Sequence, residues 1–153
     1  LSPGDIDERV KAAFAHARSL DTKCAEIYFG GYNESDPLKR FLSFFLLVES
    51  LTQRTFSKID HKAAIDDLLK NHAHISKSGS ILLNSHRSHW KDLMARFVWC
   101  VMQQWSHMND DDIDQFKELK EVRDKIAHGS LQKPDGADVL KIEALALKIL
   151  KGS

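Results

Sequence analysis

Residues 36–51 read DPLKRFLSFFLLVESL and contain the longest apolar run of the chain, Phe41–Val48, which only Ser43 interrupts. The Asp36 side chain can accept hydrogen bonds from the first free N–H groups of a helix, and Pro37 is tolerated at the first helical position. The helix that follows is apolar on nearly every side, so we expect it to lie at the centre of a bundle. The run is too short to span a bilayer, and we expect no membrane as a partner.

Helical periodicity continues on both sides of this stretch. Apolar residues recur at intervals of three and four, the spacing of one helix face, and nowhere alternate as in a strand. Gly30-Gly31 is expected to end the first helix, and the polar residues 71–80 are expected to form a flexible loop. The sequence therefore predicts an all-α fold, an antiparallel bundle of five or six helices joined by short loops. We expect helices over about 5–29, from Pro37, after Asp60, over 85–108 with Ser85 as its cap, from Asp110 to Gly129, and from Gly136 onward.

Length, charge and cysteine content limit the class of protein. We expect a single domain over residues 1–153, and because the sequence begins at Leu1 rather than Met we expect a trimmed chain or part of a longer one. Lys plus Arg and Asp plus Glu both number 22, so the zero net charge argues against a broad electrostatic nucleic-acid binder, but not against a local phosphate site. Cys24 and Cys100 lie among apolar residues and are expected to be buried free thiols. With no signal peptide in the sequence, a reducing cytoplasm is the expected location.

The stretch that carries chemistry is residues 119–129, which read LKEVRDKIAHG. At about 100° per residue, Arg123 lies on the apolar face of its helix, where an unpaired charge is very costly, so it needs a partner or a cleft. Asp124 and His128 are four residues apart and therefore neighbours on the helix surface, so Asp124 is expected to hold the imidazole in one orientation. His128 lies at the helix C-terminus, which favours its charged form. An arginine and an oriented histidine are a pair suited to handling phosphate.

A purely structural interpretation fits the same residues. Arg123 would then pair with an internal carboxylate such as Glu49, and His128 would bond the last carbonyls of its helix. Glu49 is either an acid paired with a base for structure, or the residue that orients Arg123 or tunes His128. Removing one partner of a buried ion pair costs roughly 3–5 kcal/mol, so replacing Glu49 is expected to damage folding as well as activity. Spacing alone leaves both interpretations open.

Residues 118–129 resemble the signature of the HEPN superfamily, all-helical domains named for higher eukaryotes and prokaryotes nucleotide binding. The family motif is an arginine, a polar residue, three variable positions and a histidine, which Arg123, Asp124 and His128 match. The polar residue is most often Asn in the family, and Asp occurs there too. Residues 41–51 are similar to the aromatic-rich helix of the abortive-infection, ApeA-like branch. The resemblance covers most of the chain in helix order, but only residues 118–129 in motif detail.

The resemblance implies a bundle that forms a homodimer, with the two Arg–His motifs facing each other. Many members are metal-independent endoribonucleases in toxin–antitoxin, phage-defence or RNA-processing systems, which implies RNA as substrate, an antitoxin or other protein as partner, and no cofactor. The ribose 2′-hydroxyl attacks the adjacent phosphate, with His128 moving the proton and Arg123 stabilising the phosphate charge. Asp124 and Glu49 complete the expected catalytic set. Other members have lost activity, so the alternative is a non-catalytic dimerisation or nucleotide-binding module.

The remaining histidines and tryptophans carry weaker signals. His72 with His74, and His86 with His89, have no acidic residue beside them at ligand spacing, so we expect no metal site. Trp99 lies off the apolar stripe of its helix and is expected to be exposed in the dimer interface.

Overall fold

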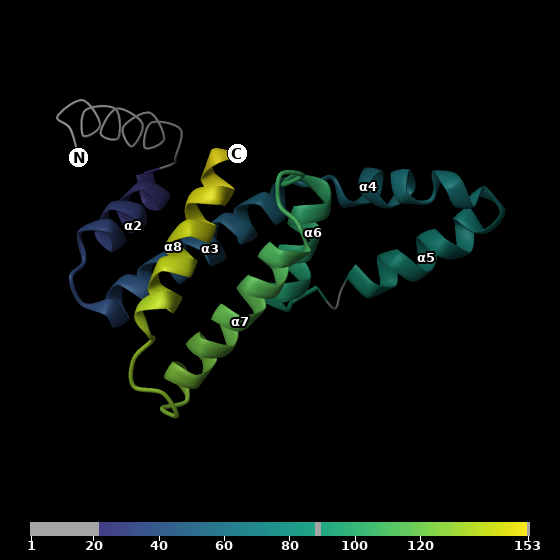
Figure 1. Cartoon of the computed structure of the whole chain (residues 1–153). Coiled ribbons are helices and arrows are strands. Elements are labelled where there is room, and N and C mark those ends of the chain that lie inside the picture. Colours follow the sequence, from purple (N-terminus) through teal and green to yellow (C-terminus); the bar gives the residue numbers. More distant parts are fainter. Residues whose placement is uncertain (1–21, 88–89, 153) are drawn as a thin grey trace.

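The structure, a computed structural model, describes residues 22–87 and 90–152. Those residues form seven α-helices and one 3-10 helix, and none of them lies in a strand (Figure 1). The all-α fold expected from the sequence is confirmed, although the described residues alone hold more helices than the five or six expected, and the part of the expected first helix before Thr22 lies outside them. The elements are α2 (Thr22–Asn33), α3 (Pro37–Lys58), α4 (His61–Leu68), the 3-10 helix η1 (Lys70–Ile75), α5 (Ser76–Arg87), α6 (Leu93–Gln103), α7 (Asp110–Ala127) and α8 (Gly136–Lys151).

Helix α3 is the centre of the bundle, as its apolar sequence predicts. It packs against α2, α6 and α8, and residues on most of its sides are buried. Its start is fixed locally, because the Asp36 carboxylate accepts hydrogen bonds from the N–H groups of Leu38 (2.9 Å) and Lys39 (3.1 Å). Neither α3 nor any other described helix combines the length and the apolar character that crossing a membrane requires.

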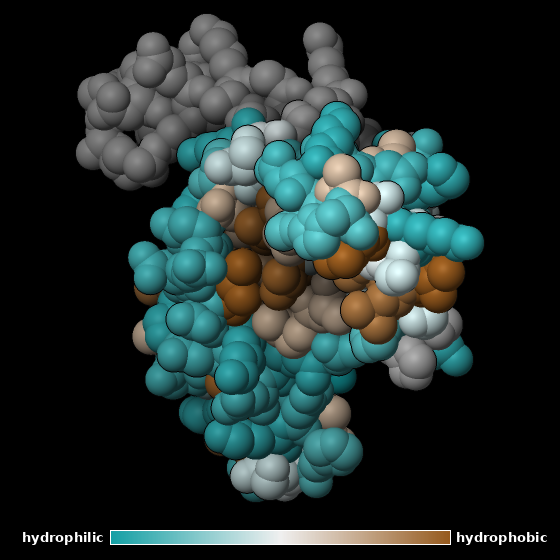
Figure 2. Space-filling model, turned by 90° about the vertical axis from the view of Figure 1, so that its right-hand side faces the viewer, coloured by the Kyte–Doolittle hydropathy of each residue, from teal (hydrophilic) through white to brown (hydrophobic). Residues whose placement is uncertain are grey.

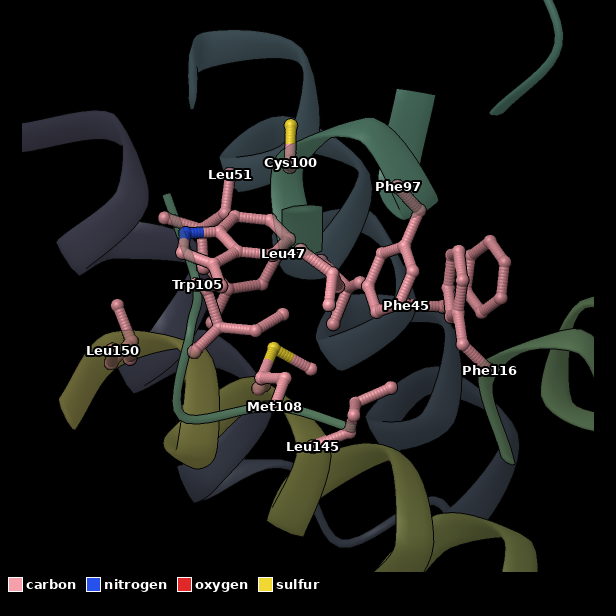
Figure 3. Close-up of a cluster of buried hydrophobic side chains, with 14 of the residues drawn as sticks. Phe45, Leu47, Leu51, Phe97, Cys100, Trp105, Met108, Phe116, Leu145 and Leu150 are labelled. Carbon is pink, nitrogen blue, oxygen red and sulfur yellow. The ribbon is translucent and has the colours of Figure 1, made fainter. Parts of the chain in front are cut away.

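A column of aromatic rings joins α3, α7 and α6 (Figure 3). The ring centroids of Phe45 and Phe116 lie 5.7 Å apart, and those of Phe116 and Phe97 lie 4.1 Å apart. Trp105 follows the end of α6 and meets Phe97 edge-on, with the centroids 5.6 Å apart. All four side chains are buried, so the three helices share one core.

Both cysteines are buried free thiols, as the sequence predicts. The Cys100 thiol donates a weak hydrogen bond to the carbonyl oxygen of Thr52 at 3.5 Å. Burial raises the pKa of Cys100 to about 12, because a thiolate loses its hydration inside the core. Cys100 therefore stays protonated at neutral pH and serves packing rather than chemistry.

The glycine pair in α2 does not end the helix, contrary to the prediction. α2 continues through Gly30 and Gly31 to Asn33. A Cβ atom on Gly31 would lie 3.1 Å from the Cβ of Ser43 in α3, closer than side chains normally approach. Gly31 therefore serves the close contact of two helices, and that packing offsets the cost of about 1 kcal/mol that glycine carries inside a helix.

The expectation of a flexible loop over residues 71–80 is also wrong, because η1 and α5 occupy this stretch. A Cβ atom on Gly79 would lie 2.8 Å from Cδ2 of Leu69, so the glycine lets α5 fold back closely onto the residue that ends α4. Composition indicated a loop here, but the contact between neighbouring helices decides the structure.

The helix expected over 85–108 is α6, which begins later, at Leu93, and ends earlier, at Gln103. Ser85 lies within α5, where its hydroxyl donates to the carbonyl oxygen of Leu82 at 2.7 Å. The cap of α6 is instead Asp92, whose carboxylate accepts from the N–H of Ala95 at 3.1 Å. Ser85 is therefore not the cap. Serine and aspartate are both suited to capping, but Ser85 lies inside α5, and Asp92 starts α6.

Helices α4, η1 and α5 form an arm that extends away from the bundle (Figure 1). Helix α5 packs on α4 and η1. Figure 2 views the molecule from the side on which the arm projects, and it shows hydrophobic side chains gathered in a hollow among hydrophilic ones. The exposed large apolar side chains of the arm are Leu68, Ile75, Ile81 and Leu82.

The connection from α7 to α8 depends on one left-handed residue. Gly129 has φ of 73°, and its N–H donates to the carbonyl oxygen of Ile126 at 3.0 Å. The N–H of Ser130 donates to the carbonyl oxygen of Lys125 at 2.9 Å, so two carbonyls of the last turn are satisfied. The predicted helix end at Gly129 is confirmed.

Replacing Gly129 with Ala is expected to lower the free energy of unfolding by about 1–2 kcal/mol, because a Cβ atom disfavours the left-handed backbone. Gly136→Ala is the matched control, since Gly136 has no positive φ and open space around it. Chemical denaturation should show the control unchanged or slightly more stable. Equal losses in the two variants would contradict the role of Gly129.

Candidate functional site

Helix α7 carries the motif and is fixed on the bundle at its start. The N–H of Asp112 donates to the Asn109 side chain at 3.2 Å, and the N–H of Asn109 donates to the Asp112 carboxylate at 2.9 Å. This reciprocal capping box starts the helix, and Lys148 of α8 pairs with Asp112 at 2.7 Å. One turn and two turns further on, Phe116 and Leu119 are buried. The cap, the ion pair and the apolar face together set the direction in which the motif residues project.

Arg123 contacts three side chains. Its Nη2 lies 3.0 Å from Oε1 of Glu49, and its Nη1 lies 3.0 Å from Oδ1 of Asp124. Its Cζ lies 5.1 Å from the ring centroid of Phe45. The pairing with Glu49 that we weighed from the sequence is therefore present, and the guanidinium is held in one orientation while its side chain is 31% exposed.

Asp124 bonds cations rather than the imidazole. Lys120 Nζ donates to Oδ2 of Asp124 at 2.8 Å, while Oδ1 faces Arg123. The hydrogen bond from Lys120 lowers the pKa of Asp124 and is the largest influence on it; burial opposes this shift, and the charges of Arg123, Lys120 and His128 lower the pKa further. The expected hydrogen bond from the His128 ring to the Asp124 carboxylate is thus replaced by a charge-assisted hydrogen bond from Lys120 and an ion pair with Arg123, and the link to His128 is electrostatic.

His128 occupies the C-cap position of α7. Its backbone N–H donates to the carbonyl oxygen of Asp124 at 2.9 Å, and its side chain is exposed. The sequence left open whether His128 caps the helix or handles phosphate. Its backbone ends the helix, while its ring faces solvent, so an incoming ligand can reach the imidazole.

A groove of about 440 Å³ lies between α2 and α3 beside the Arg123–Glu49 pair. Glu49 lines this groove and also bonds Arg123, so it connects the motif to the groove. The residues that line it are Lys23, Cys24, Glu49, Ser50, Gln53, Arg54 and Ser57, and apolar atoms of these side chains form most of its surface.

Arg96 is a residue of this region that the sequence analysis missed. Its Nε donates to the carbonyl oxygen of Trp90 at 2.7 Å, its Nη1 donates to Oε1 of Gln53, and its Cζ lies 5.4 Å from the ring centroid of Phe56. No carboxylate among the described residues pairs with it, in contrast to Arg123. The signal was present in the sequence, because Arg96 is the one charged residue of α6.

The expectation that Trp99 is exposed in a dimer interface is wrong. Trp99 is only 7% exposed, and its Nε1 donates to Nδ1 of His61 at 3.2 Å. Its ring centroid lies 4.5 Å from that of Trp90, and those of Phe56 and His61 also lie 4.5 Å apart. Trp99 therefore packs against the root of the arm, in an aromatic cluster of Phe56, His61, Trp90 and Trp99.

The histidines weighed as metal ligands do not come together with acids in the described part of the chain. No group of three His, Cys, Asp or Glu side chains within residues 22–87 and 90–152 is arranged to hold a metal ion. The rings of His72 and His74 lie 6.3 Å apart on the exposed surface of the arm, and His89 lies outside the described residues.

Comparison with known proteins does not assign the chain to a family. No family model, no curated protein and no solved structure matches it. The resemblance to the HEPN superfamily therefore rests on the motif residues Arg123, Asp124 and His128 themselves.

The Arg123–Glu49 pair is expected to contribute little to stability, because both side chains are about one-third exposed. A double-mutant cycle with Glu49→Gln and Arg123→Gln should give a coupling energy of at most about 1 kcal/mol by chemical denaturation. The pair of Arg40 and Glu143, 2.7 Å apart on α3 and α8, serves as the control. A coupling of several kcal/mol would restore the expectation that replacing Glu49 disrupts folding.

Proposed function

We propose that the chain is a metal-independent endoribonuclease of the HEPN type that cuts single-stranded RNA. The observation that carries this proposal is the arrangement on α7: an arginine held in one orientation by Glu49 and Asp124, followed by an exposed histidine at the helix end. A role as a toxin or phage-defence effector, an antitoxin as partner and a cytoplasmic location belong to the same proposal, and they rest on the resemblance of the motif.

The proposed reaction uses the two groups that the motif brings to the surface. The ribose 2′-oxygen attacks the neighbouring phosphorus while its proton leaves, and the bond from phosphorus to the 5′-oxygen breaks. His128 moves the proton, and the 5′-oxygen takes up a proton as it leaves. Arg123 stabilises the negative charge on the phosphate oxygens through charge-assisted bonds. The products are a cyclic phosphate and a 5′-hydroxyl, and the need for a 2′-hydroxyl selects RNA.

A homodimer is part of this proposal, and one surface beside the motif supports it. Leu42 and Leu46 of α3 are exposed, and they share a face of the helix with Glu49, which pairs with Arg123. Apolar side chains next to a charged site are typical of a contact between chains. A two-fold axis here would bring two copies of Arg123 and His128 close together.

The alternative, a non-catalytic dimerisation or nucleotide-binding module, also has a specific observation in its favour. Two carboxylates compensate the charge of Arg123, and the Asp124 carboxylate bonds Lys120 rather than the ring of His128. A phosphate must therefore compete with Glu49 and Asp124 for the guanidinium.

Replacing His128 with Ala is expected to lower the rate of RNA cleavage about 10²–10⁴-fold, the usual contribution of general acid–base catalysis. Arg123→Ala should be comparably damaging through the phosphate charge, whereas Asp124→Asn should keep much of the activity. His74→Ala is the matched control, because His74 is an exposed histidine on the arm. The assay is cleavage of mixed single-stranded RNA with chelator present, with cyclic-phosphate ends as the readout.

Loss of cleavage on adding chelator would contradict the metal-independent mechanism. Undiminished cleavage by the His128→Ala protein would assign the activity elsewhere. A folded wild-type chain that binds a nucleotide through Arg123 but never cuts RNA would establish the non-catalytic alternative.

Replacing Leu46 with Glu is expected to convert the dimer into monomers, because a charge would be buried in the apolar contact. Leu140→Glu on α8 is the control, since Leu140 is an exposed leucine on another helix. Light scattering at tens of micromolar protein measures the mass of each variant. A wild-type monomer, or a dimer that Leu46→Glu leaves intact, would contradict the proposed interface.

A further inference from the structure

One face of α3 holds two arginines from other helices in similar ways. Phe45, Glu49, Gln53 and Phe56 are spaced four, four and three residues apart and therefore form one stripe along the helix. Arg123 of α7 lies over the ring of Phe45 and bonds Glu49. Arg96 of α6 lies over the ring of Phe56 and bonds Gln53. The two guanidinium groups are thus placed on consecutive stretches of the same stripe.

The two arginines differ in how their charge is compensated. Arg123 faces two carboxylates, whereas the partners of Arg96 are a carbonyl oxygen, an amide oxygen and an aromatic ring, all of them neutral. Such partners orient a guanidinium, and no carboxylate of the described residues lies within ion-pair distance of it. A half-buried, oriented arginine of this kind is suited to bind an anion, and a phosphate accepts its hydrogen bonds best.

Aromatic side chains surround the same arginine. In the aromatic cluster, Phe56, His61 and Trp90 are only partly buried. Partly exposed rings beside a cation are the combination that single-stranded nucleic acids use, because bases stack on the rings while phosphates meet the cation. Gln53, which bonds Arg96, lines the groove between α2 and α3 together with Glu49, so these two residues of the stripe are open to a ligand.

We propose that Arg96, oriented by Gln53, binds a phosphate of single-stranded RNA, and that a neighbouring base stacks on the partly exposed rings of Phe56 and Trp90. Glu49 and Gln53 lie four residues apart, about 6 Å along the helix axis, so one strand that follows α3 passes from Arg96 to Arg123. This subsite rests on the proposed function, since it places the strand on the path to the motif. It adds a binding site that lies outside the HEPN motif.

The test measures binding of a fluorescent single-stranded 2′-O-methyl RNA, which cannot be cut, to the full chain by anisotropy. Arg96→Gln is expected to weaken binding on the order of tenfold at low salt, and to reduce the slope of log affinity against log salt by about 0.7, the value for one phosphate contact in a single strand. Lys39→Gln is the matched control, because it removes one exposed positive charge near the start of α3.

A second measurement uses the stacking itself. Binding should quench tryptophan fluorescence in the wild-type protein, and Trp90→Phe should abolish most of that quenching while the chain stays folded by circular dichroism. Arg96→Lys keeps the positive charge but loses the forked donor geometry of the guanidinium. It should therefore retain the slope of log affinity against log salt and lose part of the affinity. These two variants test the subsite even if Arg96→Gln fails to fold.

Unchanged affinity and salt slope in a folded Arg96→Gln protein would overturn the subsite. Equal losses in Lys39→Gln would do the same, because binding would then follow overall charge. RNA cleavage that stays intact in Arg96→Gln, with an unchanged KM, would reject the subsite alone. Binding that depends on Arg96 without any cleavage by the wild-type chain would support the subsite and reject the proposed ribonuclease activity.

Discussion

Phe45 of α3 contacts two side chains of α7, the ring of Phe116 and the guanidinium of Arg123, and these contacts fix one helix on the other. Stacking of the rings supplies the apolar part of the contact. It also brings the one-third exposed guanidinium of Arg123 against the ring of Phe45. Glu49, one turn further along α3, pairs with Arg123 and orients it more than it stabilises the fold. The core and the candidate site are therefore two ends of one helix–helix contact.

Four helix starts were predictable because a cap is a local feature, whereas the start of α6 at Asp92 was not. Asp36, Asp60, Asn109 and Asp135 each accept a hydrogen bond from a backbone N–H two or three residues later, so the residues that start each helix lie next to one another in sequence. Two of the glycines gave the opposite result, although Gly129 ends α7 as predicted. Gly31 and Gly79 lie inside helices because another element approaches them closely, and such an approach is invisible in local sequence.

The candidate site was also predictable only as far as local spacing in the sequence determines it. Spacing placed Arg123 on the buried side of α7 and made Glu49 a reasonable partner, and the structure pairs them. Spacing also made Asp124 a neighbour of His128, but it did not rank the donors that compete for one carboxylate. Lys120, one turn earlier, and Arg123 carry permanent charges and take both oxygens of Asp124. Arg96 went unnoticed because its partners come from α3 and from the residues before α6.

Under the proposed function, the contrast between Arg96 and Arg123 explains how a chain of zero net charge would attract RNA. A charge that carboxylates compensate exerts little force beyond its immediate neighbours, whereas an uncompensated charge acts over a distance set by salt, about 8 Å at physiological ionic strength. On the proposed path, Arg96 therefore contributes the attraction, and Arg123 contributes the orientation, because its two carboxylate partners hold the guanidinium still. A phosphate that reaches Arg123 must displace or share those partners. In the proposed reaction, their competition would favour a doubly charged transition state over a singly charged substrate, because the anion of greater charge binds the guanidinium more strongly and displaces the carboxylates more readily.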